Sequence, residues 1–444
     1  MKPIMLTVAL AAVAAPAAAQ NRIDGQAADA PALSAYGDFD IGVRRLDVVN
    51  PDQVDILAID PDAPPPATLP RYDRPLAVEM WYPAQDGATG DTTLDAFIRD
   101  GATEVELQGR AVRDAAPAAA GEPFPLVVVS HGYPGNRFLL SHLAENIASK
   151  GYVVASIDHT DSTYRDQAAF GSTLVNRPLD QLHVLDEVAR INADLSSDLA
   201  GLIDTDNAGL VGYSMGGYGA VITAGGGVTQ GAVDAPFGAP HGTLGVHLAG
   251  SDTHEALPDD RFKTAVAFAP WGRQIDVWDA EGLAGVDIPM LFVGGSADAV
   301  SGYEEGFRRI WEEVVGVDRA LLTFEGGGHN TAAPIPAPEE AFAAGVADHY
   351  VDPVWDTVFM NNVAQHFVTA WLDGILKGDA DAAAFLDLPV DGAGGWTGFA
   401  DGAADGLRYE TLAAGQVAPV PVPGSAWLLG LALGGMAVAR RRRS

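Results

Sequence analysis

Six short apolar runs, separated by segments long enough to be helices, limit how this chain can fold. They are Phe124–Ser130, Tyr152–Ile157, Gly209–Tyr213, Thr264–Phe268, Met290–Val293 and Leu321–Phe324. Strands that are apolar throughout belong in a parallel sheet covered on both faces. The alternating run Pro75–Pro83 predicts a further strand. The sequence therefore predicts an α/β fold, with a mostly parallel central sheet between two layers of helices.

The segments between and after these runs include five helix candidates and two irregular regions. The helix candidates are His142–Lys150, Leu179–Leu195, Tyr218–Ala224, Tyr303–Val314 and Trp355–Leu376. Residues 225–258 are rich in Gly and His without a clear period, which predicts a loop or cap inserted after the helix 218–224. Residues 20–70 are expected to be loop-rich, because Pro61–Pro66 fits neither a helix nor a central strand. Residues 71–412 should then form one domain.

Both ends of the chain carry patterns typical of targeting segments. Residues 1–19 combine Lys2, an uncharged Ala-rich run and small residues at positions 17–19, which predicts a secretory signal peptide. Residues 417–444 contain a Pro-rich lead-in, an apolar run and the cluster Arg440–Arg443. This order predicts a membrane-entering tail whose Arg cluster stays in the cytoplasm. The bulk of the protein would then be exported.

Charge and composition exclude several classes of function. The formal net charge is −33, and so acidic a protein repels phosphate backbones, which argues against nucleic-acid binding. The chain has no Cys, which excludes disulfides, thiolate metal sites and Cys nucleophiles. His241, His247 and His254 share no helical ligand spacing, so no metal site is predicted.

A serine motif lies where a predicted strand meets a predicted helix. Gly212–Gly216 fits G-x-S-x-G, and its small residues permit a tight turn that holds the Ser214 hydroxyl above the sheet. Ser214 is therefore the predicted nucleophile. The following helix begins at this turn, so the backbone N–H of Met215 is predicted to bind an oxyanion.

A serine nucleophile needs a base, and the base needs an orienting carboxylate. Asp298 and His329 each follow the carboxyl end of a predicted strand, the edge at which α/β sheets hold their sites. We therefore predict Asp298 as the acid and His329 as the base. Asp276 or Asp279 is an alternative acid. His366, in the last predicted helix, is interpreted as a packed or capping residue.

Two further positions complete the predicted site. The loop Ser130–Gly135 follows the first central strand, and the Tyr133 backbone N–H is the predicted second oxyanion donor. His131 is interpreted as a hydrogen-bonding residue behind this loop. Trp271 follows the strand 264–268 and is predicted either to contact substrate at the mouth of the site or to lie in the core.

Several of these motifs together resemble one group of α/β-hydrolases. They are Ser130–Gly135, Gly151–Ala155, Asp158-His159, Arg177–Asp180, Gly212–Gly217, Ala269–Trp271, Met360–His366, Leu376–Asp379 and Trp396–Phe399. The group is that of the predicted dienelactone hydrolases, which are related to platelet-activating-factor acetylhydrolases and cutinase-like polyesterases. The resemblance covers roughly residues 74–410. It implies an α/β-hydrolase fold, ester hydrolysis without a cofactor, and Ser214, Asp298 and His329 as the triad.

The resemblance extends in part to the cutinase-like enzymes. Tyr133, Met215 and Trp271 match their oxyanion and aromatic-clamp positions. Dienelactone hydrolases proper use a Cys nucleophile, which this chain lacks. A cap formed by residues 225–258 would favour small or lipid-like esters over a solid polymer.

The C-terminal tail resembles the PEP-CTERM/VPLPA sorting tails of Gram-negative bacteria. The resemblance rests on the Pro motif 419–423, the apolar run that follows and the Arg cluster 440–443. It implies an exosortase-like processing partner and delivery to the outer surface. An ordinary membrane anchor is the alternative.

The sequence thus predicts an exported serine carboxylic-ester hydrolase that acts on small or lipid-like esters. A cutinase-like polyesterase is the first alternative, and its substrate would be a polymeric ester. A surface binding protein that has lost catalysis on a hydrolase scaffold is a second. A serine peptidase is a third, because acyl transfer to water uses the same triad.

Overall fold

The computed structural model describes residues 21–119, 121–167, 170–236 and 238–418. The predicted signal peptide, residues 1–19, lies outside the described residues, as does all but the start of the predicted tail, residues 417–444. Among the helices of the described residues, none combines the length and the apolar character that a membrane crossing needs.

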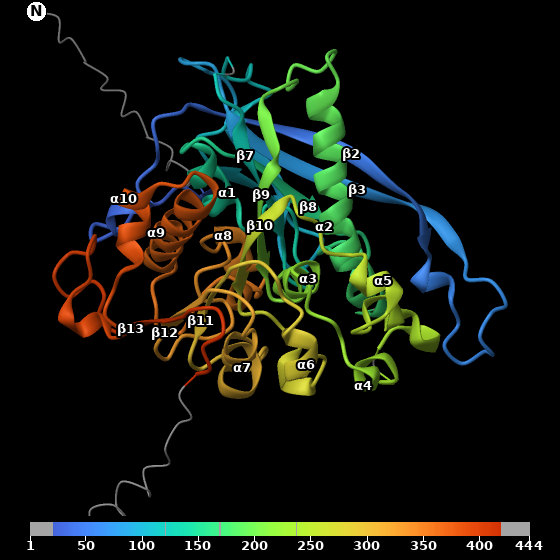
Figure 1. Cartoon of the computed structure of the whole chain (residues 1–444). Helices are drawn as coiled ribbons and strands as arrows, with labels where there is room; N and C mark the ends of the chain where they lie inside the picture. The colour runs from blue at the N-terminus through green and yellow to red at the C-terminus, as the bar shows by residue number, and fades with distance from the viewer. Residues whose placement is uncertain (1–20, 120, 168–169, 237, 419–444) are drawn as a thin grey trace, which may run out of the picture.

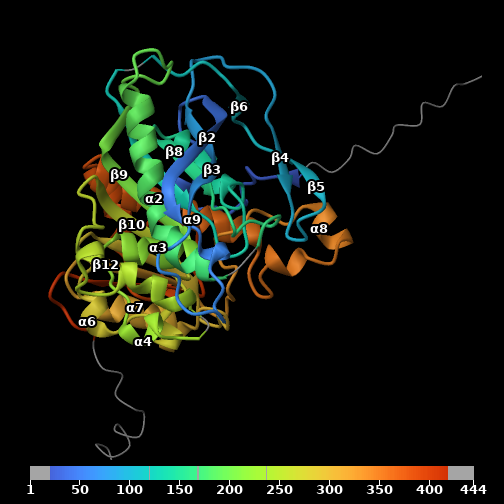
Figure 2. The ribbon, with the colours of Figure 1, turned by 90° about the vertical axis from the view of Figure 1, so that its right-hand side faces the viewer.

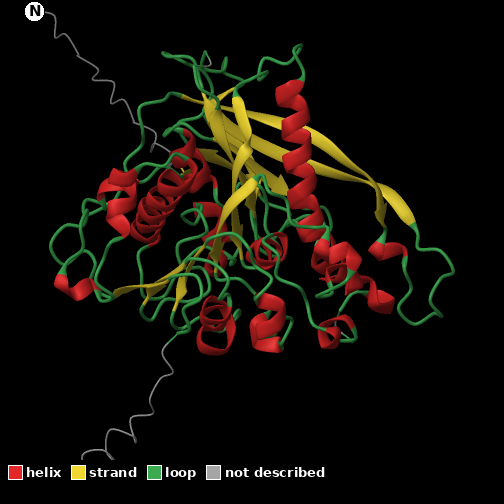
Figure 3. Cartoon of the chain, in the orientation of Figure 1, coloured by secondary structure: helices red, strands yellow, loops and turns green. Residues whose placement is uncertain are grey.

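A ten-stranded sheet forms the centre of the protein, in the order β13-β12-β11-β10-β9-β7-β8-β3-β2-β6 (Figures 1 and 3). Six neighbouring strands are parallel. They are β7 (Phe124–Ser130), β8 (Val153–Asp158), β9 (Ile203–Tyr213), β10 (Phe262–Phe268), β11 (Met290–Gly295) and β12 (Arg319–Phe324). The predicted mostly parallel sheet is confirmed, and the six apolar runs form its parallel part.

Further strands extend this parallel part at both ends, and their pairing is antiparallel except between β2 and β6, which are parallel. On one side lie β3 (Arg71–Pro83), β2 (Ile41–Val54) and then the short β6 (Val112–Arg113), and on the other lies β13 (Leu407–Leu412). A separate three-stranded sheet consists of β1 (Asn21–Arg22), β5 (Glu104–Gln108) and β4 (Thr93–Phe97).

The expectation that residues 20–70 are loop-rich is wrong for residues 41–54. These residues form β2, which pairs with β3 along most of its length. The strand is buried at Val43 and Val48, while the charged Arg45 and Asp47 are exposed. Val43 shares one face of the strand with the exposed Arg45 and Asp47, whereas Val48 lies on the other face. The buried face thus changes along the strand, and no single apolar alternation runs through it. The Pro-rich stretch 61–66 does lie in a loop, between β2 and β3.

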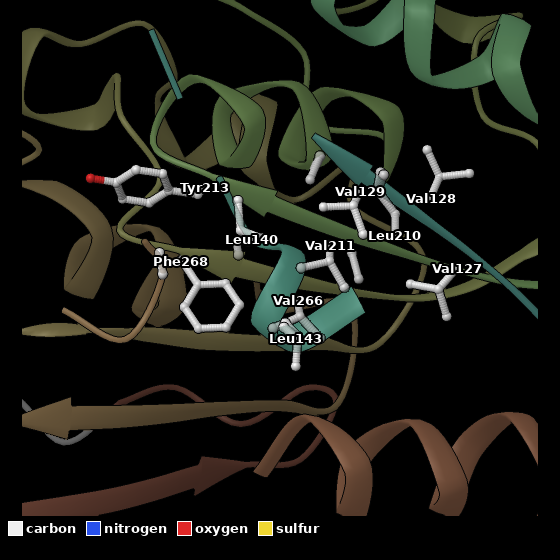
Figure 4. Packing of buried hydrophobic residues seen from close by; sticks show 14 of the residues in the cluster. Val127, Val128, Val129, Leu140, Leu143, Leu210, Val211, Tyr213, Val266 and Phe268 are labelled. Atoms are coloured by element: carbon white, nitrogen blue, oxygen red, sulfur yellow. The ribbon is translucent and has the colours of Figure 1, made fainter. Parts of the chain in front are cut away.

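Helices cover both faces of the sheet, as predicted. The helices α1 (Ser141–Ala148) and α9 (Thr357–Leu376) pack together on one face, and α2 (Phe170–Ala193) and α3 (Met215–Thr223) pack together on the other (Figures 1 and 2). The shorter helices are α4 (Gln230–Val233), α5 (Asp252–Glu255), α6 (Ala280–Leu283), α7 (Arg308–Glu313), α8 (Glu339–Ala343) and α10 (Ala380–Ala383). Figure 4 shows the core between these layers, where Val127, Val211 and Val266 of neighbouring strands pack.

Helix α2 begins well before the predicted Leu179 and runs through Pro178. Proline has no N–H, so within this helix it leaves the carbonyl of Leu174 without its usual donor. The hydroxyl of Tyr218, on α3, donates to that carbonyl at 3.0 Å. A bond between two helices therefore replaces the missing bond within one, and a local pattern could not reveal it.

The insertion 225–258 contains α4, α5 and the 3₁₀ turn Pro240–His247, and it packs along α2. Two of its histidines are buried and hydrogen-bonded to backbone carbonyls: His247 Nε2 to Val175 at 2.7 Å, and His254 Nε2 to Gly225 at 3.1 Å. His247 therefore joins the insertion to α2, and His254 joins the two ends of the insertion, so neither ring is part of a surface loop.

A buried acid on α1 makes stability depend on pH. The carboxyl of Glu145 accepts hydrogen bonds from the backbone N–H groups of Arg110 and Ala111, and burial raises its pKa from 4.5 to about 8. The folded protein therefore keeps a proton on Glu145 between pH 4.5 and 8, whereas the unfolded chain loses it. Over this window the free energy of unfolding falls as pH rises.

We predict that Glu145→Gln removes this fall in the free energy of unfolding, because the amide keeps an acceptor oxygen and does not titrate. Relative to the wild type, its free energy of unfolding should rise by about 2–4 kcal/mol between pH 5 and pH 8, at about 1.4 kcal/mol per pKa unit. Urea denaturation at the two pH values measures this difference. The exposed Glu122→Gln is the control. A Glu145→Gln effect that does not vary with pH would contradict the prediction.

Candidate active site

Ser214 occupies the sharp turn between β9 and α3. Its backbone has φ +53° and ψ −110°, which is unusual for a residue with a side chain. Its N–H donates to the carbonyl of Phe268, at the end of β10, at 2.8 Å. A Cβ on Gly216 would overlap the Ser130 carbonyl oxygen, and one on Gly212 would overlap the Gly216 carbonyl. Both glycines of the motif are therefore required by close backbone approach.

The structure brings Ser214, Asp298 and His329 together, although they are far apart in sequence. His329 Nε2 lies 3.0 Å from Ser214 Oγ, and His329 Nδ1 lies 2.9 Å from Asp298 Oδ2. Because Nδ1 faces a carboxylate it carries the proton, which leaves Nε2 to accept the hydroxyl proton. This is the arrangement that activates a serine for nucleophilic attack.

Backbone donors hold the carboxylate of Asp298 in place. Its other oxygen, Oδ1, accepts hydrogen bonds from the N–H groups of Val300 at 2.7 Å and Ser301 at 2.9 Å. The Asp298 side chain is fully buried, whereas that of His329 remains 15% exposed. The acid is thus fixed inside the protein and the base reaches the surface.

The alternative residues are engaged elsewhere. Asp276 is exposed and paired with Arg273 at 2.5 Å, and Asp279 caps α6 by accepting from the Gly282 N–H at 2.8 Å. His366 is buried, and its Nδ1 accepts from the Leu33 N–H at 3.0 Å, which fits a packed residue. Of the three candidate acids, Asp298 is the one that contacts His329.

The predicted oxyanion donors flank Ser214. Met215 is the first residue of α3, so its N–H has no acceptor within the helix. The loop after β7 contacts the Ser214 turn at Gly132, where a Cβ would lie 3.3 Å from the Ser214 Cβ. Tyr133 is the next residue of that loop. The backbone amides of Tyr133 and Met215 therefore come from the two segments that meet beside the hydroxyl.

Three partly exposed aromatic rings, Tyr133, Phe170 and Trp271, form a row beside this site. The backbone N–H of Trp271 donates to the Ser214 carbonyl at 3.3 Å, so the tryptophan is hydrogen-bonded to the turn of Ser214. Phe170 makes edge contacts with both other rings, with centroid distances of 5.3 Å. Trp271 thus lies at the site and is not fully buried in the core.

Sequence interpretation missed Phe170, because it placed the start of the helix at Leu179. A single phenylalanine in an unassigned segment carries no periodic signal. The insertion reaches this point too: a Cβ on Gly171 would lie 3.0 Å from the Ala239 Cα. The aromatic row therefore borders the insertion 225–258.

A second Ser-His-Asp array lies buried behind the loop after β7. Ser130 Oγ is 2.9 Å from His159 Nε2, and His159 Nδ1 is 2.9 Å from Asp180 Oδ2. Burial lowers the pKa of His159 well below its ordinary value, so the ring is neutral. Ser130 has no exposed surface, whereas 7% of Ser214 is exposed. Of these two serines, Ser214 is the one that reaches the protein surface.

Comparison with known proteins finds similarity to several ester hydrolases. Residues 113–241 match the family described as PETase, PET hydrolase-like. Cutinase 2 of Thermobifida cellulosilytica is 26% identical over 204 residues, which cover 46% of this chain and 59% of that protein. The platelet-activating factor acetylhydrolase of Canis lupus familiaris is 37% identical over 59 residues, or 12% of this chain and 13% of that protein.

These alignments span about half the length of the cutinases and a smaller part of the acetylhydrolase. A solved structure, of a ferulic acid esterase from Streptomyces cinnamoneus, has a TM-score of 0.55 and 20% identity, and covers 88% of this chain and 99% of that chain. The chain therefore has an α/β-hydrolase fold, as predicted. Membership of the dienelactone hydrolase group stays a prediction.

We predict that Gly216→Ala destabilises the protein, because its methyl group would displace the backbone at Ser130. Overpacking of this kind costs about 1–3 kcal/mol. Urea denaturation measures the loss. The matched control is Gly121→Ala, whose Cβ would meet nothing within 4 Å. Equal stability of the two variants would contradict the close approach described for Gly216.

Proposed function

We propose that this protein hydrolyses carboxylic esters with Ser214 as nucleophile, His329 as base and Asp298 as orienting acid. The observation that carries the proposal is the hydrogen-bonded chain from Ser214 Oγ through His329 to Asp298, with contacts of 3.0 and 2.9 Å. The matches to PET hydrolase-like, cutinase and acetylhydrolase sequences support ester substrates.

In the acylation step, His329 Nε2 accepts the hydroxyl proton while Ser214 Oγ attacks the ester carbonyl carbon. The carbonyl π electrons move to oxygen, and the N–H groups of Tyr133 and Met215 bind the resulting oxyanion. When the tetrahedral intermediate collapses, the alcohol oxygen leaves and takes the proton from His329. Asp298 holds the ring and stabilises its positive charge throughout.

In the deacylation step, water attacks the Ser214 ester. His329 removes a proton from the water, and a second oxyanion forms at the same two N–H groups. Collapse breaks the bond to Ser214 Oγ, which takes back the proton from His329. The products are a carboxylic acid and an alcohol, and each step uses only protein groups and water.

The surroundings of Ser214 favour an uncharged ester with an apolar part. The row of Tyr133, Phe170 and Trp271 offers apolar ring surface beside the nucleophile. Small or lipid-like esters are the proposed substrates, because the insertion 225–258 contacts α2 next to Phe170 and would limit the space that a solid polymer needs beside the row. A polyester is the second candidate, favoured by the PET hydrolase-like match over residues 113–241.

The proposal includes export to the outer surface of a Gram-negative bacterium. Its support is the uncharged Ala-rich run within residues 1–19 and the tail 417–444, with its Pro-rich lead-in and terminal Arg cluster. An exosortase-like enzyme would process that tail.

We predict that Ser214→Ala lowers kcat on p-nitrophenyl butyrate by at least a factor of about 10³, because no other group can form the acyl-enzyme. Folding should be unchanged, as circular dichroism can check. The matched control is Ser130→Ala, which removes the hydroxyl of the buried array and should lower kcat by less than about tenfold. Full activity of Ser214→Ala would refute the assignment.

A series of p-nitrophenyl esters from acetate to palmitate identifies the acyl group. Rates that peak at short chains support small esters, and rates sustained at long chains support lipid-like ones. Release of soluble acids from a polyester film supports the polyesterase alternative. No turnover of any ester or film would contradict the proposed function.

A further inference from the structure

Arg177 lies behind the loop after β7, buried within α2 with 1% of its surface exposed. Its guanidinium donates to the carbonyl of His131, to the carbonyl of Gly132 at 3.3 Å and to the hydroxyl of Ser162. Two of these acceptors are consecutive carbonyls, and they lie directly before Tyr133. The arginine therefore binds two backbone carbonyls of the proposed oxyanion loop from inside the protein.

The surroundings of the Arg177 charge are unusual for a buried arginine. Among the described residues, no carboxylate forms a salt bridge with it, whereas the neighbouring Arg74 pairs with Asp180 at 2.8 Å and Asp161 at 3.0 Å. Burial and the charge of Arg74 lower the pKa of Arg177 to about 9, which still leaves it charged at neutral pH. The positive charge of Arg177 thus lies against backbone carbonyls, and burying it costs free energy of desolvation.

The geometry of the Gly132–Tyr133 peptide relates these hydrogen bonds of Arg177 to the active site. The peptide between Gly132 and Tyr133 is trans, so its C=O and N–H point in opposite directions. The C=O faces Arg177, and it also accepts from His131 Nδ1 at 2.6 Å. The Nδ1 of His131 carries the proton, because its Nε2 accepts from the His159 N–H at 3.2 Å. The Tyr133 N–H is therefore directed away from Arg177.

Gly132 itself packs against the Ser214 turn, since a Cβ on it would lie 3.2 Å from the Tyr213 ring and 3.3 Å from the Ser214 Cβ. The loop therefore contacts Arg177 through its carbonyls and the Ser214 turn through the Gly132 Cα. We propose that Arg177 is a positioning residue, which holds the Gly132–Tyr133 peptide so that its N–H faces the oxyanion formed at Ser214. Its charge also polarises this peptide, which makes the N–H a stronger donor. The inference rests on the proposed ester hydrolysis.

The test compares Arg177→Met with wild type on p-nitrophenyl butyrate and on a trifluoromethyl ketone. The ketone carbon accepts Ser214 Oγ, the proton moves to His329, and the resulting hemiketal oxyanion mimics the transition state. We expect kcat to fall about 10–100-fold with KM changed less than about threefold, since loss of an oxyanion donor costs up to about 10²–10³ in kcat. The affinity for the ketone should fall in parallel with kcat.

The matched control is Arg319→Met. Arg319 is equally buried and also donates to backbone carbonyls, those of Trp311, Val317 and Gln416 among them, at the start of β12. This variant should lose stability while its kcat and ketone affinity stay within about threefold of wild type. If the effect came from removing any buried arginine, kcat and ketone affinity would fall in Arg319→Met as well as in Arg177→Met. That result would overturn the proposal.

Arg177→Lys provides a second test should Arg177→Met fail to fold. It keeps the charge and loses the forked donor, so we expect kcat and ketone affinity to fall together by about 3–30-fold. Wild-type kcat in either soluble variant, or a loss confined to KM, would overturn the proposal. Failure of the proposed function itself would appear separately, as a wild-type protein without esterase activity.

Discussion

The close approach of two backbone segments at the centre of the sheet determines the rest of the site. The turn that carries Ser214 packs against the carboxyl end of β7, where Gly216 meets the Ser130 carbonyl without room for a side chain. This contact sets the distance between Ser214 and the loop that carries Tyr133. The parallel pairing of β7, β9 and β10 holds these two segments next to each other. Asp298 and His329 come from the loops after β11 and β12, at the same edge of the sheet.

Two Ser-His-Asp arrays of nearly equal geometry lie close together, and their environments separate their roles. The array of Ser130, His159 and Asp180 is sealed, and Arg74 holds its carboxylate. It serves as a buried polar network that joins β7 to α2. In the array of Ser214 the ring of His329 is partly exposed, and the first turn of α3 lies beside the serine. Hydrogen-bond geometry alone therefore does not identify a catalytic serine; access and oxyanion donors are needed as well.

The sequence predicted those features that follow from local pattern and strand order. The apolar runs predicted the parallel strands, and the Ser214 turn followed from its glycines and its place between strand and helix. Asp298 and His329 were predicted as acid and base because both follow strand ends, and Asp276 and Asp279 stayed as alternatives to Asp298. The structure places Asp298, and not these two, against His329.

The features that sequence interpretation missed depend on tertiary contacts. The buried face of strand β2 changes along its length, and α2 passes through Pro178, where Tyr218 replaces the lost hydrogen bond. The positions of Phe170 and Arg177 became meaningful once the fold had placed α2 against the loop after β7. A single sequence contains no local signal for such contacts.

Covalent labelling tests most directly whether Ser214 is the activated serine of this fold. A fluorophosphonate reacts when a serine oxygen displaces fluoride from phosphorus, and peptide mapping by mass spectrometry locates the adduct. The account predicts one adduct per chain, on Ser214, with Ser130 unmodified despite its similar hydrogen bonds. An adduct on another serine, or no adduct on the folded protein, would contradict it.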